Sequence, residues 1–361
     1  MSEHRSAWND YFSGTSQPQI ISQQTTRQTP SNQCVHVLNC LFQSITASGA
    51  GGALYCVSPV TYLLVESSSF FSCKSSGRGG AIYFSNTNNG QSVLHTLCVN
   101  DCNGGSVWGQ QVCAFVYNNA LSKNYVNYSS FTRCVNYQSE SLSIYYGRVC
   151  CPSVNLSMNK LSYYSGIYLH AYVDSNSVTC SLSYSTIADT YSSSHSCFYF
   201  GTTGVKYEIK SCNILRNTQG SLNSEGTIFT NGITNIEDSC ILENTATYIF
   251  RSASSSYTIT LSNCTVDSTS NNGYLTTLNT VTKSFILALN HMSTQNCHSG
   301  YDSAGYLTAI PYVSSPTKKL FCYTCRICQG RIGDLFSITF VFMITFIYLD
   351  PSGDSWIFLK R

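Results

Sequence analysis

Short stretches in which apolar and polar residues alternate recur along most of the chain. Two examples are TYLLVESSSF, which begins at Thr61, and VKYEIKSC, which begins at Val205. A second kind of short apolar run follows a glycine, as in GGALYC from Gly51 and GGAIYF from Gly79. Alternation with a period of two is the pattern of β-strands. The sequence predicts many short strands rather than helices, because Ser, Asn, Thr and Tyr dominate and long helical periodicities are lacking.

These strands belong to a repeated unit. An apolar or permissive residue is followed three positions later by a small polar one, and this pair recurs about every 28 residues. The pairs are Leu41–Ser44, Phe70–Cys73, Val99–Cys102, Phe131–Cys134, Leu156–Asn159, Ile187–Thr190, Ile214–Asn217, Ile241–Asn244, Thr265–Ser268 and Met292–Gln295. A unit of this size cannot bury its own apolar face, so neighbouring units must stack.

We therefore predict an all-β fold, a right-handed parallel β-helix (β-solenoid) of about ten coils, one for each of the ten pairs. Parallel crossover connections are almost always right-handed, which sets the expected hand. A β-sandwich rich in Ser and Thr is the alternative, but it does not explain a register sustained over so many units.

The repeat divides the chain into three parts. Residues 1–33 lack it and are rich in Ser, Gln and Thr, so we expect a flexible segment with at most a little edge structure over the first coil. Residues 34–315 carry the β-helix repeats without a linker, and residues 316–361 form a distinct C-terminal cap or anchoring tail.

The tail contains the apolar run Leu335–Leu349, for which three interpretations stay open. A capping or terminal pair of strands is favoured, because the end of a solenoid exposes unpaired strand edges. A membrane-spanning or membrane-lying segment is the second interpretation, although a helix of this length would reach only about 22 Å against a hydrocarbon core of roughly 30 Å. A buried terminal helix is the third.

Composition limits the function. The net charge is +2 and only 10% of the residues are charged, so we expect no nucleic-acid partner. Tyr is the commonest aromatic residue, with 26 copies. Exposed Tyr is a general contact residue, but in stacked strands we expect most of these side chains to fill space. The motifs of serine hydrolases, phosphate-binding loops and zinc proteases are missing, and we expect no cofactor.

The chain has 19 cysteines, several of them at repeat positions that we interpret as equivalent. One set is Cys73, Cys102 and Cys134, and the other is Cys212, Cys240 and Cys264. Equivalent positions stack in a solenoid, so we expect ladders of small buried thiols, with disulfides only in an oxidising compartment.

A CxxCxxC motif formed by Cys322, Cys325 and Cys328 lies just ahead of the apolar run. Packing or disulfide formation is the favoured interpretation. The three cysteines are also weak candidates for a metal site, which would need a fourth ligand, with Cys297 or His298 at a non-standard spacing. Acylation beside a membrane segment is the third alternative.

One constellation of charges follows the repeat. Asp189, Arg216, Glu243 and Asp267 occupy the same or nearly the same repeat position, so we expect them to form a line on one outer face. A solvated ladder with weak surface pairing is the favoured interpretation. The alternative is a sugar- or cation-binding groove, in which Glu243 and Asp267 are weak candidates for the acid and base of a glycan-cleaving enzyme.

Two half-motifs carry a resemblance to a known family. Gly51-Gly52-Ala53-Leu54 and Gly79-Gly80-Ala81-Ile82 match the GGA[ILV] half of the repeat of polymorphic outer membrane proteins. The FxxN half is relaxed to Ile214-x-x-Asn217, Ile241-x-x-Asn244 and Leu156-x-x-Asn159. The chain thus resembles the pectate-lyase-like β-helix proteins with such repeats, including bacterial adhesins and surface-protein sets of parabasalid protists.

This resemblance covers roughly residues 34–312 and implies a surface-displayed or adhesive protein without catalytic activity. The implied partner is a host or cell-surface protein or a glycan, with Leu335–Leu349 as a membrane contact. No apolar core of the signal-peptide type follows Met1, so both a cell-surface and an intracellular location stay open. A polysaccharide lyase or hydrolase, and a degenerate repeat protein without activity, are the alternatives.

Overall fold

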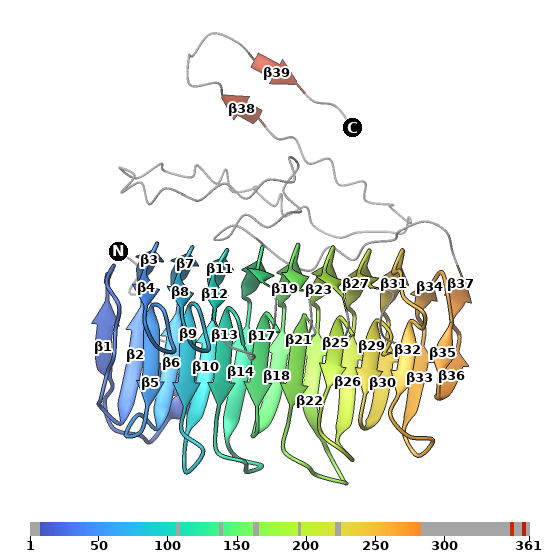
Figure 1. Ribbon diagram of the computed structural model, residues 1–361, viewed down its shortest axis with the longest axis horizontal. Helices are drawn as coiled ribbons and strands as arrows, with labels where there is room; N and C mark the ends of the chain where they lie inside the picture. The colour runs from blue at the N-terminus through green and yellow to red at the C-terminus, as the bar shows by residue number, and fades with distance from the viewer. Residues whose placement is uncertain are drawn as a thin grey trace, which may run out of the picture. The chain divides into compact units, whose positions relative to one another are not determined.

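The computed structural model shows a parallel β-helix whose coils are stacked in chain order (Figure 1). It describes residues 8–105, 109–136, 140–161, 166–193, 196–220 and 225–282, together with two short strands at 347–349 and 356–358. The chain forms two compact units, Met1–Pro311 and Tyr312–Arg361, and the β-helix belongs to the first. The predicted all-β parallel solenoid is confirmed.

Three long parallel sheets make up the walls of the helix, and every coil passes through them in the same order. The eleven-stranded sheet contains β1 (Gln19–Ser22), β2 (Cys34–Leu38), β6 (Tyr62–Glu66), β10 (Gln91–His95), β14 (Lys123–Asn127), β18 (Arg148–Pro152), β22 (Val178–Ser183), β26 (Lys206–Lys210), β30 (Ile233–Glu237), β33 (Thr258–Ser262) and β36 (Tyr274–Leu278). The ten-stranded sheet contains β3 (Leu41–Gln43), β7 (Ser69–Phe71), β11 (Cys98–Asn100), β15 (Ser130–Thr132), β19 (Asn155–Ser157), β23 (Thr186–Ala188), β27 (Asn213–Leu215), β31 (Cys240–Leu242), β34 (Thr265–Val266) and β37 (Val281–Thr282).

The nine-stranded sheet closes each coil. Its strands are β5 (Leu54–Val57), β9 (Ile82–Ser85), β13 (Val112–Phe115), β17 (Leu142–Tyr145), β21 (Ile167–His170), β25 (Phe198–Phe200), β29 (Ile228–Thr230), β32 (Phe250–Ser252) and β35 (Asn271–Asn272). Two small sheets lie before it in the coil. They consist of β4 (Thr46–Ala47), β8 (Lys74–Ser75) and β12 (Asn103–Gly104), and of β16 (Val135–Asn136), β20 (Lys160–Leu161), β24 (Tyr191–Ser192) and β28 (Thr218–Gln219).

The coil count is slightly lower than predicted, because only nine coils of the described chain contribute a strand to all three long sheets. In two of the predicted repeat pairs, the first residue is one position before the residue that the structure aligns with the other coils. Phe42, not Leu41, pairs with Phe70, and Val266, not Thr265, pairs with Ile241. The coil that begins at Val266 is much shorter than the average repeat of about 28 residues, because Val266 pairs with Thr282 of the next coil. The last predicted marker, Met292–Gln295, lies outside the described residues.

The core is a stack of apolar side chains that repeat at the same place in every coil. The inward residue of the ten-stranded sheet is fully buried in nine successive coils. These residues are Phe42, Phe70, Val99, Phe131, Leu156, Ile187, Ile214, Ile241 and Val266. Each such side chain contributes about 1.5–3 kcal/mol by burial. The stack explains why an apolar residue recurs with the repeat.

The turns between sheets use left-handed backbone conformations at fixed positions. Between the eleven- and ten-stranded sheets every coil has one residue with positive φ, from Asn39 (φ 51°) to Asn279 (φ 48°). A second row follows the ten-stranded sheet, from Ser44 (φ 55°) to Glu243 (φ 58°). This conformation is unfavourable for most L-residues, so its recurrence shows that stacking imposes it on the backbone.

The two glycine pairs have separate physical roles. Gly51 and Gly79 have φ of 67° and 66°, which glycine adopts without strain. Gly52 and Gly80 instead allow the next coil to approach closely, because a Cβ on Gly80 would lie 2.4 Å from backbone atoms of Asn103. The alanine that follows each pair faces the core. The GGA half-motif thus forms the entry corner to the nine-stranded sheet.

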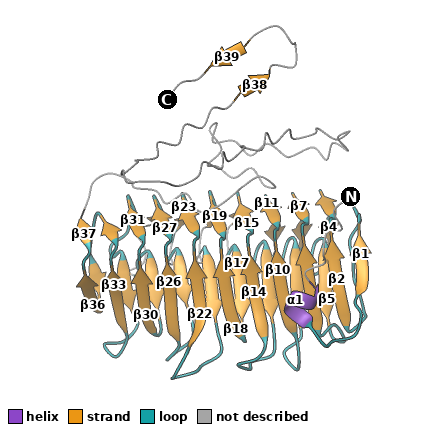
Figure 2. Cartoon of the chain, turned by 180° about the vertical axis from the view of Figure 1, so that it is seen from behind, coloured by secondary structure: helices purple, strands orange, loops and turns teal. Residues whose placement is uncertain are grey.

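The N-terminal segment, of which the structure describes residues 8–33, contains one short helix and one strand. Strand β1 pairs in parallel with β2 and adds an edge strand over the first coil. Helix α1 (Trp8–Phe12) lies against the outer face of the eleven-stranded sheet (Figure 2). Trp8 and Phe12 pack there on apolar residues of the first coils. Two aromatic residues in a five-residue helix give no periodicity that a sequence pattern could reveal.

Strands β38 (Ile347–Leu349) and β39 (Trp356–Phe358) of the second unit form an antiparallel pair. The rest of the predicted run Leu335–Leu349 lies outside the described residues. In the part of the chain that the structure describes, no helix has the length and apolar character needed to span a membrane.

Candidate functional site

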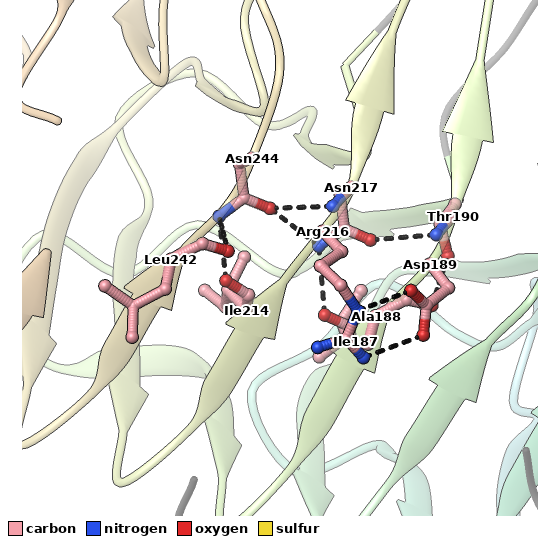
Figure 3. Close-up of polar contacts among 9 residues, drawn as sticks. All are labelled: Ile187, Ala188, Asp189, Thr190, Ile214, Arg216, Asn217, Leu242 and Asn244. Atoms are coloured by element: carbon pink, nitrogen blue, oxygen red, sulfur yellow. Dashed lines mark hydrogen bonds and ion pairs between the residues drawn. The ribbon is translucent and has the colours of Figure 1, made fainter. Parts of the chain in front are cut away.

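The charged residues singled out by the sequence lie at or next to the turn after the ten-stranded sheet, and Figure 3 shows two of them, Asp189 and Arg216. Asp189, Arg216 and Glu243 occupy the same position of three successive coils, each with a φ between 51° and 58°. Asp267 is one residue out of line, because Val266 pairs with Ile241. The predicted line on an outer face therefore exists for three of the four residues.

Arg216 and Asp189 form a two-point ion pair. The Nε–Oδ1 distance is 2.7 Å and the Nη2–Oδ2 distance is 3.0 Å. Their side chains are 34% and 37% exposed, so solvent screens the attraction. This contact ties two neighbouring coils together at their surface.

Glu243 and Asp267 are joined through the backbone. The N–H of Glu243 donates a hydrogen bond to Oδ2 of Asp267. The Asp267 carboxylate therefore satisfies a turn amide in the preceding coil, while the Glu243 side chain is exposed. This arrangement has a structural explanation and does not require a catalytic one. Their proposed role as acid and base stays a prediction.

An asparagine ladder lies directly beside these charges and explains the FxxN half-motif (Figure 3). Oδ1 of Asn217 accepts from the N–H of Thr190 at 3.1 Å, and Nδ2 of Asn217 donates to the carbonyl of Ile187 at 3.0 Å. Asn244 repeats the pattern one coil later, accepting from the N–H of Asn217 at 3.0 Å. Each carboxamide satisfies backbone groups of the coil before it, which buried polar groups need.

Cysteines take the same position in earlier coils. Cys73, Cys102 and Cys134 are in register, as predicted, and the N–H of Cys73 donates to Sγ of Cys102 at 3.3 Å. The second predicted set is wrong at one member. Cys212 and Cys264 share the turn before the ten-stranded sheet, where their thiols donate to backbone carbonyls. Cys240 lies one residue later and belongs to a small apolar cluster on the outside of the ten-stranded sheet.

The described cysteines, apart from Cys98, have free thiols, and almost all of them are buried. Burial raises the pKa of Cys134, Cys197 and Cys212 to about 12, because a buried thiolate is poorly solvated. Such thiols are unreactive at neutral pH. Cys322, Cys325 and Cys328 lie outside the described residues. Within the described ranges, no group of three or more His, Cys, Asp or Glu residues is placed to hold a metal ion.

The most distinctive surface is a row of aromatic rings on the outside of the nine-stranded sheet, called here the aromatic row. Its members, in order along the stack of coils, are Tyr55, Tyr83, Phe115, Tyr145, Tyr168, Tyr199 and Phe229. The row points away from the core, because the neighbours of Tyr55 in the strand, Leu54 and Cys56, are core residues. One ring per coil is contributed over seven coils.

The rings are in continuous contact. Successive ring centroids are 5.7, 6.4, 4.2, 5.2, 5.0 and 4.9 Å apart from Tyr55 to Phe229. The pairs Tyr55–Tyr83 and Phe115–Tyr145 are stacked, while Tyr168 and its neighbours are tilted by 32° to 43°. Aromatic pairs at these separations attract one another. Of the rings in the tilted part of the row, Tyr168 and Tyr199 are partly exposed and Tyr145 is buried.

The aromatic row changes register at its middle. Cys113 and Ser143 occupy the in-line position in two coils, and the rings come instead from Phe115 and Tyr145, two residues further along each strand. Beside this step lies the buried carboxylate of Glu140, which accepts from the hydroxyl of Ser143 at 3.3 Å. Glu140 belongs to none of the sequence motifs described above.

Three guanidinium groups lie over rings of the row. The guanidinium carbon of Arg27 is 5.6 Å from the ring centroid of Tyr55, that of Arg78 is 5.3 Å from Phe115, and that of Arg251 is 5.4 Å from Phe229. Such cation–π contacts contribute about 0.5–1 kcal/mol at exposed sites. These contacts hold rings in place at the two ends of the aromatic row and near its middle.

Two phenols in the middle of the aromatic row, Tyr145 and Tyr168, have a raised pKa. Burial raises the pKa of Tyr145, with the Glu140 carboxylate adding to the effect, and burial also raises the pKa of Tyr168. Neutral phenols can donate hydrogen bonds throughout the physiological pH range. The row thus combines aromatic rings and neutral hydroxyl groups at Tyr145 and Tyr168 with guanidinium groups over three of its other rings.

The sequence carries part of the signal for this row. The runs GGALYC, GGAIYF and GIYLHAY carry a Tyr at one shared position, and the structure aligns these residues. The register step at Cys113 and Ser143 interrupts the pattern, so only the structure shows that the rings form one continuous row.

Comparison of the chain with protein-family models, with curated proteins and with solved structures finds no match. A function must therefore be inferred from the residues themselves.

Proposed function

We propose that this chain is a non-catalytic binding protein whose aromatic row holds a linear glycan. The observation that carries the proposal is the continuous row of seven rings, which runs across the coils and parallel to the stacking direction. Five of the seven rings are partly exposed, whereas Tyr145 and Phe229 are buried. A line of partly exposed aromatic side chains is typical of surfaces that contact a partner.

A glycan fits this surface better than a charged or peptide ligand. The coils repeat at roughly 4.8 Å, which is close to the length of one pyranose unit in an extended chain. Ring faces and edges suit the apolar faces of sugars, and phenol hydroxyls suit their hydroxyl groups. The few charges beside the row are of both signs, as in Arg78 and Glu140, which argues against a strongly anionic ligand.

The test is binding of soluble glucans, mannans, xylans and chitin oligosaccharides, measured by affinity electrophoresis and calorimetry. Tyr168→Ala and Tyr199→Ala should each weaken binding about tenfold, a loss of about 1.4 kcal/mol. Tyr199→Phe, which keeps the ring, should bind with a smaller loss. Tyr117→Ala is the matched control, because Tyr117 is 41% exposed and lies outside the row.

Circular dichroism and thermal unfolding establish that each variant is folded. The proposal fails if no glycan binds, or if one binds and the two row variants bind it as well as the control does.

The alternative of a glycan-cleaving enzyme makes a different prediction. Cleavage of any of the same polysaccharides should then be lost in Glu243→Gln and in Asp267→Asn. Binding without release of reducing or unsaturated ends in the unaltered protein would leave the non-catalytic proposal standing.

A surface location belongs to the same proposal and is supported by the resemblance to repeat-containing adhesins. Protease treatment of intact cells that carry a tagged copy tests it, and carbonate washing of their membranes tests Leu335–Leu349 as an anchor. Protection from protease together with full solubility would remove the surface-display part of the proposal.

A further inference from the structure

We propose that the two ends of the β-helix bind each other, so that copies of this chain associate head to tail. The proposal concerns the terminal strands of the eleven-stranded sheet, β1 and β36, and does not depend on the aromatic row. The two strands lie at opposite ends of the stack of coils (Figures 1 and 2). Because all strands of this sheet are parallel, β1 of one copy can pair with β36 of another in the same direction.

Within the described ranges, both end strands present pairing groups without the usual protection. Among the described residues, no strand pairs with the outer edge of β1 or of β36. Edge strands of soluble proteins are normally protected by charged residues, proline or a covering element. The sequences of the two strands, QIIS and YLTTL, contain neither a charged residue nor a proline.

Exposed apolar side chains mark the same two ends. Ile20 of β1 is 63% exposed, and Tyr274 and Leu278 of β36 are 59% and 53% exposed. All three point to the outer face of the sheet, because Ile20 pairs with the outward His36, and the inward residues Ile259 and Leu261 pair with Leu275 and Thr277. In a continued sheet, Ile20 of one copy would therefore pack on the side of Tyr274 and Leu278 of the next.

The backbone geometry at the ends is compatible with continuation. Gln23, directly after β1, has φ of 54°, and Asn279, directly after β36, has φ of 48°. These are the same left-handed turns that join the eleven- and ten-stranded sheets in every coil between them. The segment after β1 also follows the path of a coil, since Leu41 N–H donates to the carbonyl of Gln24 and Tyr55 N–H to that of Gln28.

The partner inferred is a second copy of this chain rather than an unrelated protein. Its β1 and β36 run in the same direction and, in the described part of the chain, leave opposite edges of the same sheet unpaired, so the edge of one copy can continue the sheet of the next. Contact between unlike ends does not close on itself, so it produces a series of growing assemblies rather than a fixed dimer. Strand addition at a free edge is an established mode of association.

The experiment is light scattering coupled to size-exclusion chromatography on the full chain over a range of concentrations. The unaltered protein should show concentration-dependent dimers and longer species. Ile20→Lys and Leu278→Lys should each be monomeric, because every contact needs both ends. Ile233→Lys is the control, because Ile233 is a 40% exposed residue of β30 in the middle of the same sheet, and it should associate like the unaltered protein.

Mixing the two monomeric variants gives the decisive result. Ile20→Lys retains a working β36 end and Leu278→Lys a working β1 end, so the mixture should form one-to-one dimers that cannot grow. Recovery of dimers also shows that both variants are folded. The proposal is overturned if the unaltered chain stays monomeric at all concentrations. Pairing of a later segment of the same chain with the edge of β36 would give that result. It is also overturned if both variants still associate alone, or if their mixture does not dimerise.

Discussion

The early and late coils of this β-helix make the same turns with different chemistry. In the coils that contain β5 and β9, the chain enters the nine-stranded sheet through a glycine pair. In the coils that contain β9 and β13, the thiols of Cys73 and Cys102 fill the turn after the ten-stranded sheet. In later coils the glycine pair is gone, and Asn217 and Asn244 fill that turn with carboxamides. Backbone conformation at the turn is nevertheless the same in both halves.

The difference shows that stacking fixes the backbone, and that the side chains only have to be compatible with it. The left-handed residue of this turn is Asp101 in one coil, Arg133 in the next and Met158 in the next, with φ between 52° and 55°. Neither Arg nor Met favours this conformation locally. Early coils satisfy this turn with weak sulfur hydrogen bonds, in which Sγ of Cys102 accepts from the N–H of Cys73 and donates to the carbonyl of Phe70. Late coils make the same two contacts with the carboxamide of Asn217, at shorter distances.

The largest effect should come from the glycine pair of the early coils. Gly80→Ala places a Cβ 2.4 Å from backbone atoms of Asn103, which cannot move without separating two coils. We expect a loss of about 3 kcal/mol in the free energy of unfolding.

Gly49→Ala is the control, since nothing lies within 4 Å of its Cβ position. Denaturant unfolding of both variants measures the difference. Equal stability of Gly80→Ala and Gly49→Ala would show that the coils do not pack as closely as described.

The corresponding change in the late coils is Asn217→Ala. It leaves the N–H of Thr190 and the carbonyl of Ile187 without partners in a buried turn, so we expect a loss of about 2 kcal/mol. Asn235→Ala, at an exposed position on the outside of the eleven-stranded sheet, should change stability by less than about 0.5 kcal/mol. A loss no greater than that of Asn235→Ala would mean that the ladder adds no stability.

The thiols of the other turn allow a test by pH. Cys212 occupies a position that is Ser185 and Ser239 in the neighbouring coils. Burial raises the pKa of Cys212 from 9.0 to about 12, so its contribution to stability is present below pH 9.0 and is lost as pH rises toward 12. The serine of Cys212→Ser does not ionise in this pH range, so the variant does not lose this contribution. Its free energy of unfolding, relative to that of the unaltered protein, should therefore rise by about 1 kcal/mol between neutral pH and about pH 10.

Unfolding curves at the two pH values measure this change, and the difference between the two proteins removes the contribution of tyrosine ionisation. A constant difference across the pH range would show that this thiol is accessible to solvent in the folded chain.

The sequence predicted the fold from the recurrence of apolar residues such as Phe70, Ile214 and Ile241, which stack in the core. It could not place the register where two apolar residues are adjacent, as at Leu41 and Phe42, because either could face inward.

The candidate site was harder to predict than the fold. The aromatic row depends on a two-residue step between Tyr83 and Phe115, and a repeat-based alignment assumes a constant position. The charged line was predicted because Asp189, Arg216 and Glu243 are evenly spaced. Asp267, expected at the same or nearly the same position, lies one residue away, because Val266 pairs with Ile241.

The smallest effect on stability should come from the charged line, because its Arg216–Asp189 ion pair lies at the surface of the late coils. Arg216→Gln removes an ion pair whose side chains are both about one-third exposed, so we expect a loss of about 0.5 kcal/mol that shrinks further in high salt. Denaturant unfolding at low and high salt measures it, with Lys210→Gln as the control for a second exposed pair between neighbouring coils, Lys210–Glu237. A loss for Arg216→Gln as large as that for Asn217→Ala would contradict this expectation. It would mean that surface ion pairs, and not the carboxamide hydrogen bonds alone, distinguish the late coils from the early ones.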